Sequence, residues 1–68
     1  MALVDSEAIA EIEYRPASGT LFVRFVAGEW YTYFDVPVRV HRAFIEAESH
    51  GRFFQRNIRD RYSYRRVR

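Results

Sequence analysis

No cysteine occurs among the 68 residues of this chain, so neither a disulfide nor a thiolate metal site can compensate for a small hydrophobic core. A chain of this length has room for one domain, and it buries only about 60% of the surface that its unfolded form exposes. Large side chains must therefore supply the core. One tryptophan, five tyrosines and six phenylalanines are present, and each can bury roughly 150–250 Å². We expect residues 1–68 to form a single aromatic-rich domain.

Three segments in the first half of the chain have the composition of strands. Residues 10–15 alternate apolar and charged side chains, residues 20–25 are rich in β-branched and aromatic side chains, and residues 30–34 carry four aromatic ones. A four-residue turn at 16–19 and a three-residue turn that ends at Gly28 would connect them. This arrangement predicts an antiparallel meander.

The two predicted turns decide which side chains share a face of the meander. One face is apolar throughout, and we expect it to form the core: Ala10, Ile12, Tyr14, Leu21, Val23, Phe25, Tyr31 and Tyr33. On the opposite face, Glu11 would lie across from Arg24 as a cross-strand ion pair. That face is mixed in polarity, so we expect it to be the outer or partly covered one.

The second half of the chain predicts two helices. In the first helix, Pro37 suits the first helical position, and Gly51 suits the C-cap. Its sheet-facing stripe would be Val40, Ala43, Phe44 and Ala47. Phe54 and Ile58, four residues apart, predict a second helix. The predicted fold class is α+β: a three-stranded antiparallel β-meander packed on one α-helix, followed by a short second helix and an extended basic C-terminal tail or edge strand.

Charge is distributed unevenly along this arginine-rich chain. Residues 1–35 carry two arginines against six acids, a net −4, whereas residues 36–68 carry nine arginines against three acids, a net +6. Arginine suits bidentate phosphate contact, although skewed codon usage would also produce eleven arginines and no lysine. We expect a small non-catalytic binding module that contacts RNA or DNA backbone through its C-terminal part. The candidate residues are Arg52, Arg56, Arg59, Arg61, Tyr62, Tyr64, Arg65 and Arg66.

Two alternatives to nucleic-acid binding stay open. In the first, Tyr62 and Tyr64 pack on the domain, and the arginines form a solvated face or pair with the acidic N-terminal half. In the second, the chain is a protein–protein interaction module for an unknown partner, or a module that associates with itself. We expect a monomer or a weak homo-oligomer. Its candidate patch consists of Val38 and Ile45, which point away from the predicted helix stripe, or of Trp30 and Phe34 on the outer sheet face.

Catalytic and metal-binding patterns are missing from the sequence. No serine lies in a G-x-S-x-G turn, and Ser49 and His50 are adjacent on a helix end, which turns their side chains apart. His41 and His50 lack the close spacing of metal ligands. We therefore expect no enzyme, no cofactor and no metal. No apolar run approaches the ~18 residues of a membrane span and no signal segment is visible, so we expect a cytoplasmic protein without membrane contact.

A set of short motifs, taken in order, resembles the KTSC family, which is named for a module at the C-terminus of some lysyl-tRNA synthetases. The motifs are Leu21-x-Val23-x-Phe25, Gly28, Tyr31-x-Tyr33, Val36-Pro37, Ala47-x-Ser49-x-Gly51, Phe54, Ile58-Arg59 and Tyr62, within about residues 6–65. One departure is His41, where the family often carries an aromatic residue. The resemblance implies a short α+β module, alone or appended to other proteins, with no established activity, cofactor or catalytic residue. RNA as the partner rests on analogy with the synthetases.

Overall fold

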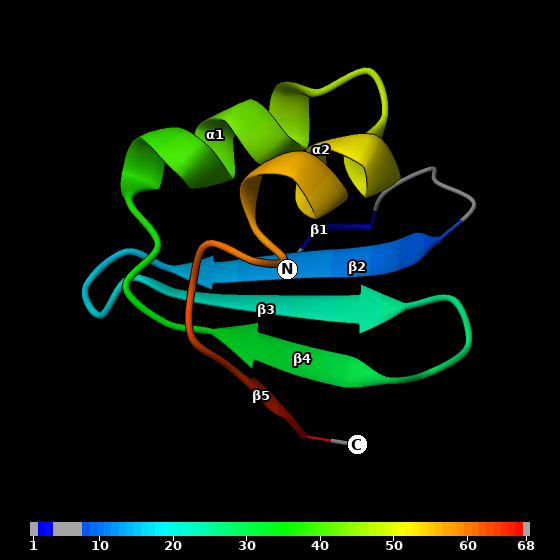
Figure 1. Cartoon of the computed structure of the whole chain (residues 1–68), viewed down its shortest axis with the longest axis horizontal. Coiled ribbons are helices and arrows are strands. Elements are labelled where there is room, and N and C mark those ends of the chain that lie inside the picture. Colours follow the sequence, from blue (N-terminus) through cyan, green and yellow to red (C-terminus); the bar gives the residue numbers. More distant parts are fainter. Residues whose placement is uncertain (1, 4–7, 68) are drawn as a thin grey trace.

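The computed structural model describes residues 2–3 and 8–67, which form a five-stranded antiparallel sheet and two helices (Figure 1). The elements are β1 (Ala2–Leu3), β2 (Ile9–Arg15), β3 (Thr20–Phe25), β4 (Trp30–Tyr33), α1 (Val38–Glu46), α2 (His50–Asn57) and β5 (Tyr64–Arg66). The strands lie side by side in chain order. The α+β class is confirmed, but the described sheet has two more strands than the predicted meander, because β1 and β5 pair with its two edges.

The meander β2–β3–β4 has the predicted register. Val23 pairs with Tyr31 and Leu21 pairs with Tyr33. At the second turn the Gly28 amide donates to the Phe25 carbonyl over 2.8 Å, and Gly28 has a φ of +109°. A left-handed glycine at this position is what a three-residue turn requires.

One residue of the predicted core face is wrong. The register of β2 against β3 shifts between Ile9 and Glu11, so Ala10 is an extra residue that forms a β-bulge. The bulge moves Ile9 onto the core face, where it is fully buried. The other seven residues of that face are either buried or packed against the core.

Helix α1 differs from its prediction at both ends. It begins at Val38, so Pro37 is the extended residue before the helix and not its first position. It ends at Glu46, and the role of Gly51 as its C-cap was therefore wrong. The predicted stripe holds at Phe44, which is buried, whereas Ala43 is exposed.

A serine after α1 starts the next helix. The Ser49 hydroxyl accepts a hydrogen bond from the Arg52 amide over 3.2 Å, so Ser49 is the N-cap of α2. Phe54 in the middle of α2 and Ile58 just after it are buried in the same core as Phe44. The predicted second helix is thus confirmed, and both helices pack on the same face of the sheet.

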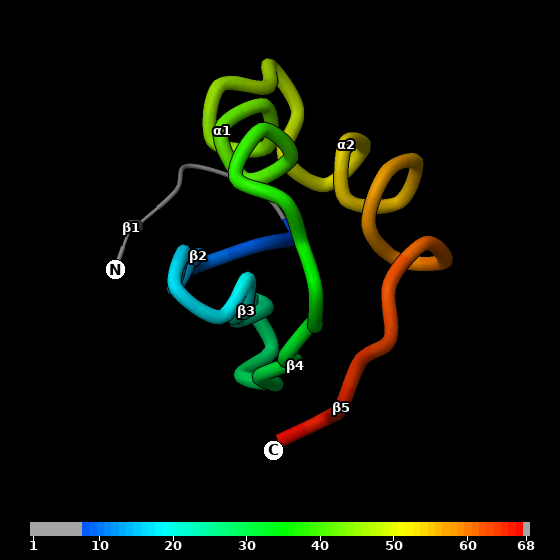
Figure 2. Tube along the Cα trace, turned by 90° about the vertical axis from the view of Figure 1, so that its left-hand side faces the viewer, coloured from blue at the N-terminus to red at the C-terminus, as the bar shows by residue number. Residues whose placement is uncertain are grey.

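The end of the chain is an edge strand and not a free tail. Tyr64 pairs with Tyr33 of β4, and the Val67 amide donates to the Trp30 carbonyl over 2.8 Å. Figure 2 shows α2, the connecting segment 58–63 and β5 running down one side of the molecule. Residues of α2 and of β5 therefore lie on the same side of the molecule.

Candidate functional site

The residues predicted to contact nucleic acid all belong to α2, the segment 58–63 and β5, which lie on one side of the molecule (Figure 2). Their exposure divides them. Tyr64 is 58% exposed, whereas Tyr62 is half-buried and packs against the core. The six arginines of the set are all exposed: Arg52, Arg56, Arg59, Arg61, Arg65 and Arg66. We call these six arginines together with Tyr64 the basic surface.

Among residues 8–67, most arginines of the basic surface form no ion pair, although Asp60 lies between Arg59 and Arg61 in the chain. Within residues 8–67, the ion pairs join Arg15 to Glu13 and Arg24 to Glu11, and both of these acids lie on β2. Five arginines therefore have no carboxylate at contact distance in the described part of the chain: Arg52, Arg56, Arg59, Arg61 and Arg65. The predicted alternative, pairing with the acidic N-terminal half, is not found among the described residues; the acids at positions 5 and 7 lie outside them.

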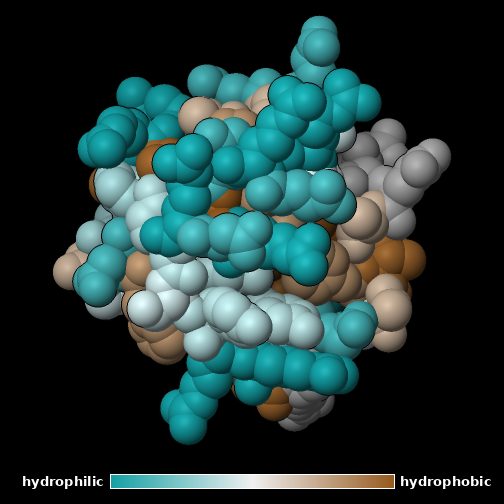
Figure 3. Space-filling model, viewed as in Figure 1, coloured by the Kyte–Doolittle hydropathy of each residue, from teal (hydrophilic) through white to brown (hydrophobic). Residues whose placement is uncertain are grey.

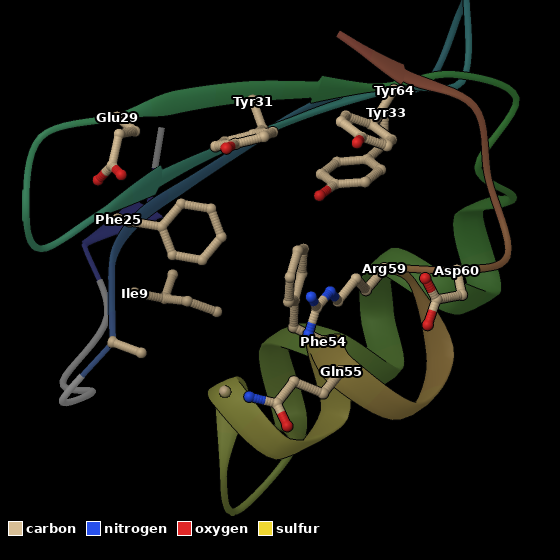
Figure 4. Close-up of a pocket in the computed structure, with 12 residues that line it drawn as sticks. Ile9, Phe25, Glu29, Tyr31, Tyr33, Phe54, Gln55, Arg59, Asp60 and Tyr64 are labelled. Atoms are coloured by element: carbon tan, nitrogen blue, oxygen red, sulfur yellow. The ribbon is translucent and has the colours of Figure 1, made fainter. Parts of the chain in front are cut away.

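A groove of about 440 Å³ separates α2 from β4 and β5 (Figure 4). Five of its twelve lining residues are aromatic: Phe25, Tyr31, Tyr33, Phe54 and Tyr64. Polar groups come from Glu29, Gln55, Arg59 and Asp60. In the space-filling view, hydrophilic side chains gather over the helices and again at the lower edge of the molecule, with a paler band between them (Figure 3). Arg59 and Tyr64 belong to both the groove and the basic surface.

Four of the aromatic rings hold one another in place. Phe25 contacts Tyr31 and Phe54 edge-on, with ring centroids 5.5 and 5.3 Å apart. Tyr33 contacts Phe54 edge-on at 5.4 Å and lies 6.4 Å from Tyr31. Edge-to-face contacts at these distances are the favoured geometry of aromatic pairs. The floor of the groove is therefore preformed.

Tyr64 brings the one strongly exposed ring to this floor. Its centroid lies 5.8 Å from that of Tyr31 and 5.6 Å from that of Tyr33. Because Tyr33 is only 3% exposed, a ligand would reach Tyr64 first and then the half-buried rings of Tyr31 and Phe25.

The two ends of the groove differ in charge. Figure 4 shows the Glu29 carboxylate near the Tyr31 side chain at one end and the Arg59 guanidinium beside Phe54 further along. Burial raises the pKa of the Tyr33 hydroxyl to about 12, and the nearby Tyr31 and Tyr64 add to the rise, while Arg59 opposes it. At neutral pH the Tyr33 hydroxyl is therefore uncharged. The groove offers the Glu29 carboxylate at one end, flat aromatic surface in the middle and the Arg59 guanidinium further along, with the Asp60 carboxylate next to Arg59.

The sequence prediction did not include most of this groove. Phe25, Tyr31 and Tyr33 were assigned to the core alone, and Glu29 and Gln55 were given no role. One available signal was the pair of hydroxyls in Tyr31-x-Tyr33, because a face that is buried throughout does not require them and a buried tyrosine hydroxyl usually finds a polar partner.

Both histidines contact neighbouring residues of the fold. The His41 ring stacks on Tyr14, with centroids 4.4 Å apart and planes inclined by 13°, so it fills the position of an aromatic residue. Burial lowers the pKa of His41. A ring nitrogen of His50 lies 3.1 Å from the Ile45 carbonyl oxygen. Among residues 8–67 no three metal-binding side chains come together, and no described helix has the length and apolar character to span a membrane.

The alternative interaction patch was predicted as either of two pairs, Val38 with Ile45 or Trp30 with Phe34. Ile45 packs against the core, so its predicted orientation away from the sheet was wrong, whereas Val38 is 49% exposed. On the outer sheet face the Arg24 guanidinium lies 6.0 Å from the Trp30 ring centre and forms the predicted bond to Glu11, with Nε 2.8 Å from the carboxylate oxygen. Phe34 is 39% exposed.

The fold and groove define a small α+β module, in which two helices cover one face of an antiparallel sheet. The family model of the KTSC domain matches residues 5–62, which is most of the chain. The chain belongs to the KTSC domain family.

Several similar proteins match most of this chain. A protein of Tsukamurella paurometabola is 39% identical over 62 residues, which cover 91% of this chain and 92% of the relative. The solved structure of a KTSC domain protein from Yersinia pestis has a TM-score of 0.92 and 35% identity, and the match covers 98% of this chain and 94% of that one. The lysine–tRNA ligase of Nostoc sp. is 32% identical over 59 residues, which cover 87% of this chain but only 10% of the ligase.

Proposed function

We propose that this KTSC domain is a non-catalytic module that binds single-stranded RNA or DNA through the basic surface. The observation that carries the proposal is the set of exposed arginines without a carboxylate at contact distance in the described chain. Each guanidinium can hold a phosphate bidentately. Tyr64 lies among them with an exposed ring, and stacking of one base on such a ring contributes roughly 1–3 kcal/mol.

The arrangement of the arginines favours an extended strand over a single anion. Arg52, Arg56 and Arg59 follow one another at spacings of four and three residues along α2 and its end. The Arg61 side chain donates to the Arg56 carbonyl over 3.3 Å, which holds it near the end of the helix. A single strand that contacts four of these arginines loses affinity with a log–log salt slope of about −3. Between 50 and 200 mM salt this slope corresponds to a loss of about 50-fold.

The relatives support RNA as the first partner to test. Two lysine–tRNA ligases, from Nostoc sp. and Trichormus variabilis, contain a segment similar to this domain. The segment covers only 10% of each ligase, so their name describes proteins far longer than this chain. A tRNA and a single-stranded RNA of the same base composition are therefore the probes of choice, with single-stranded DNA as the third.

Fluorescence anisotropy of labelled 12-nucleotide strands and of tRNA, at 50 and 200 mM salt, tests the proposal. We expect Arg59→Gln to reduce the salt slope by about 0.7. Arg42→Gln is the matched control, because Arg42 is also exposed but lies on α1, outside the basic surface. Binding that salt does not weaken, or equal losses in both variants, would rule out phosphate contact by the basic surface.

A protein-interaction or self-associating module is the second proposal. It is supported by apolar exposure away from the groove, at Phe34, Val38 and Val67. Sedimentation equilibrium at rising protein concentration is the test. Self-association that Val38→Ser or Phe34→Ser reduces supports this second function, and a monomer at all concentrations removes its homo-oligomeric form.

A further inference from the structure

We propose, on the basis of the nucleic-acid function above, that the aromatic groove takes one unstacked guanine base. Glu29 would bind the hydrogen-bond donors of the base, and Arg59 would bind the neighbouring phosphate. The inference adds a sequence preference to a surface that would otherwise bind any single strand.

The size and lining of the groove suit a single base. Its volume of about 440 Å³ lies within the ordinary range of small-ligand pockets, roughly 300–1,000 Å³. Five aromatic residues line it, and four of the rings already hold each other at centroid distances of 5.3–6.4 Å. A base that stacks there does not have to order the side chains first, which reduces the cost of binding.

The charges along the groove restrict how a ligand can lie. The carboxylates of Glu29 and Asp60 both repel a phosphate, so the anionic part of the ligand must lie at the Arg59 guanidinium, the one cationic group among the residues that line the groove. Figure 4 shows Glu29 and Arg59 at separate places along the groove, with Asp60 next to Arg59. A ligand that fits must therefore be flat in its middle, donate hydrogen bonds at one end and carry negative charge at the other. A nucleotide has this distribution.

Guanine matches a carboxylate better than the other bases do. Its Watson–Crick edge presents two adjacent donors, N1–H and the N2 amino group, which a carboxylate accepts in parallel. Adenine and cytosine place a single amino group beside an acceptor nitrogen that repels the carboxylate, and uracil has one N–H between two carbonyl oxygens. Two donors in register with two acceptors favour guanine.

Glu29 is held in position and is available for this contact. Its carbonyl accepts the Phe25 amide over 2.8 Å, which fixes the residue at the end of the β3–β4 turn. Its side chain forms no ion pair within residues 8–67. The residue is half-buried and lines the groove.

Four uridine heptamers that carry G, A, C or U at the central position test the inference by fluorescence anisotropy at 50 mM salt. We expect the G heptamer to bind about tenfold more tightly than the U heptamer, since a bidentate contact is worth roughly 1–3 kcal/mol of discrimination. In Glu29→Gln this preference should fall below about threefold, while binding of the U heptamer is retained. Glu46→Gln, an exposed acid on α1, is the matched control and should keep the preference.

The outcomes separate this inference from the function on which it rests. Equal, salt-sensitive affinity for all four heptamers overturns the guanine site and leaves the nucleic-acid module standing. No binding of any heptamer or of tRNA overturns both. A guanine preference that survives in Glu29→Gln overturns the role of Glu29.

A measurement on the unaltered protein does not depend on how the variants fold. Guanosine monophosphate should shift the amide signals of Glu29, Tyr31 and Arg59 more than uridine monophosphate does at equal concentration. Equal shifts from the two nucleotides, or shifts outside the groove, contradict the inference.

Discussion

Replacing each of the three glycines with alanine should change the free energy of unfolding in three different ways. Gly19 has a φ of +68°, and a Cβ there would lie 3.3 Å from the Val36 carbonyl oxygen. Gly28 also has a positive φ, but among the described residues nothing lies within 4 Å of its Cβ position. Gly51 lies in the first turn of α2 without a positive φ, and its Cβ would meet the Ala8 methyl group at 3.7 Å.

The magnitudes follow from these geometries. A left-handed alanine costs roughly 1–2 kcal/mol, which we expect for Gly28→Ala. At Gly19 the contact with Val36 adds to this cost, because the Val36 amide donates to the Gly19 carbonyl over 2.8 Å and a shift of this backbone weakens a bond worth about 1 kcal/mol. Gly19→Ala should therefore cost about 2–3 kcal/mol. Gly51→Ala should stabilise by about 0.5–1 kcal/mol, since alanine favours the helix.

Urea unfolding at 25 °C, with equal m-values required of all four proteins, measures these changes. A domain of this size has a total stability of roughly 3–10 kcal/mol, so the Gly19→Ala midpoint should fall far below that of the unaltered chain. The sign at Gly51 is decisive. A loss there as large as that at Gly28 would mean that Gly51 is a left-handed helix cap after all, and that α2 does not begin at His50.

Two further predictions concern ionisation, and a third concerns one partly buried hydrogen bond. Because the pKa of Tyr33 is raised from 10.0 to about 12, the folded state favours the protonated hydroxyl, and the free energy of unfolding should fall by up to about 3 kcal/mol between pH 10 and 12. Urea unfolding of Tyr33→Phe should lack this part of the loss, and identical pH profiles of the two proteins would contradict the prediction. Burial lowers the pKa of His41, so its stabilising contribution holds above pH 6.5 and is lost as pH falls through the folded value; an NMR titration midpoint at or above 6.5 would contradict this. Tyr14→Phe removes the hydroxyl that donates to the Val36 carbonyl and should cost about 0.5–1.5 kcal/mol in urea unfolding, whereas an unchanged midpoint would show that the bond contributes nothing.

The meander could be predicted because its sequence pattern and its turns act locally. Side chains alternate with period two along β3, and Ala27-Gly28 favours the three-residue turn that places Val23 opposite Tyr31, because a two-residue turn would require a positive φ at Ala27. The register then follows without knowledge of the rest of the fold. The same local logic predicted the Glu11–Arg24 pair.

Features that depend on competing local choices were harder to predict. The alternation of Ala10 with its neighbours fits a regular strand, and only the pairing of Ile9 with Phe25 reveals the inserted residue. Gly51 suits a helix C-cap and Ser49 suits a helix N-cap. The N-cap wins here, because a helix that starts at His50 buries Phe54 in the core.

The candidate site could be predicted only in part for a similar reason. Exposed arginines follow from polarity and from their clustering in the sequence. The groove, in contrast, joins Tyr31 of β4, Phe54 of α2 and Tyr64 of β5. No local pattern places these three elements together, because the position of β5 beside β4 depends on the path of the whole chain after α2.

An amide NMR titration of the isotope-labelled domain with tRNA and with a single-stranded RNA, at low and moderate salt, tests the proposed function most directly. We predict shifts at residues 52–66 and at Glu29 and Tyr31, which fade as salt rises. An unmoved spectrum, or shifts confined to the outer sheet face around Trp30 and Phe34, would contradict binding through the basic surface.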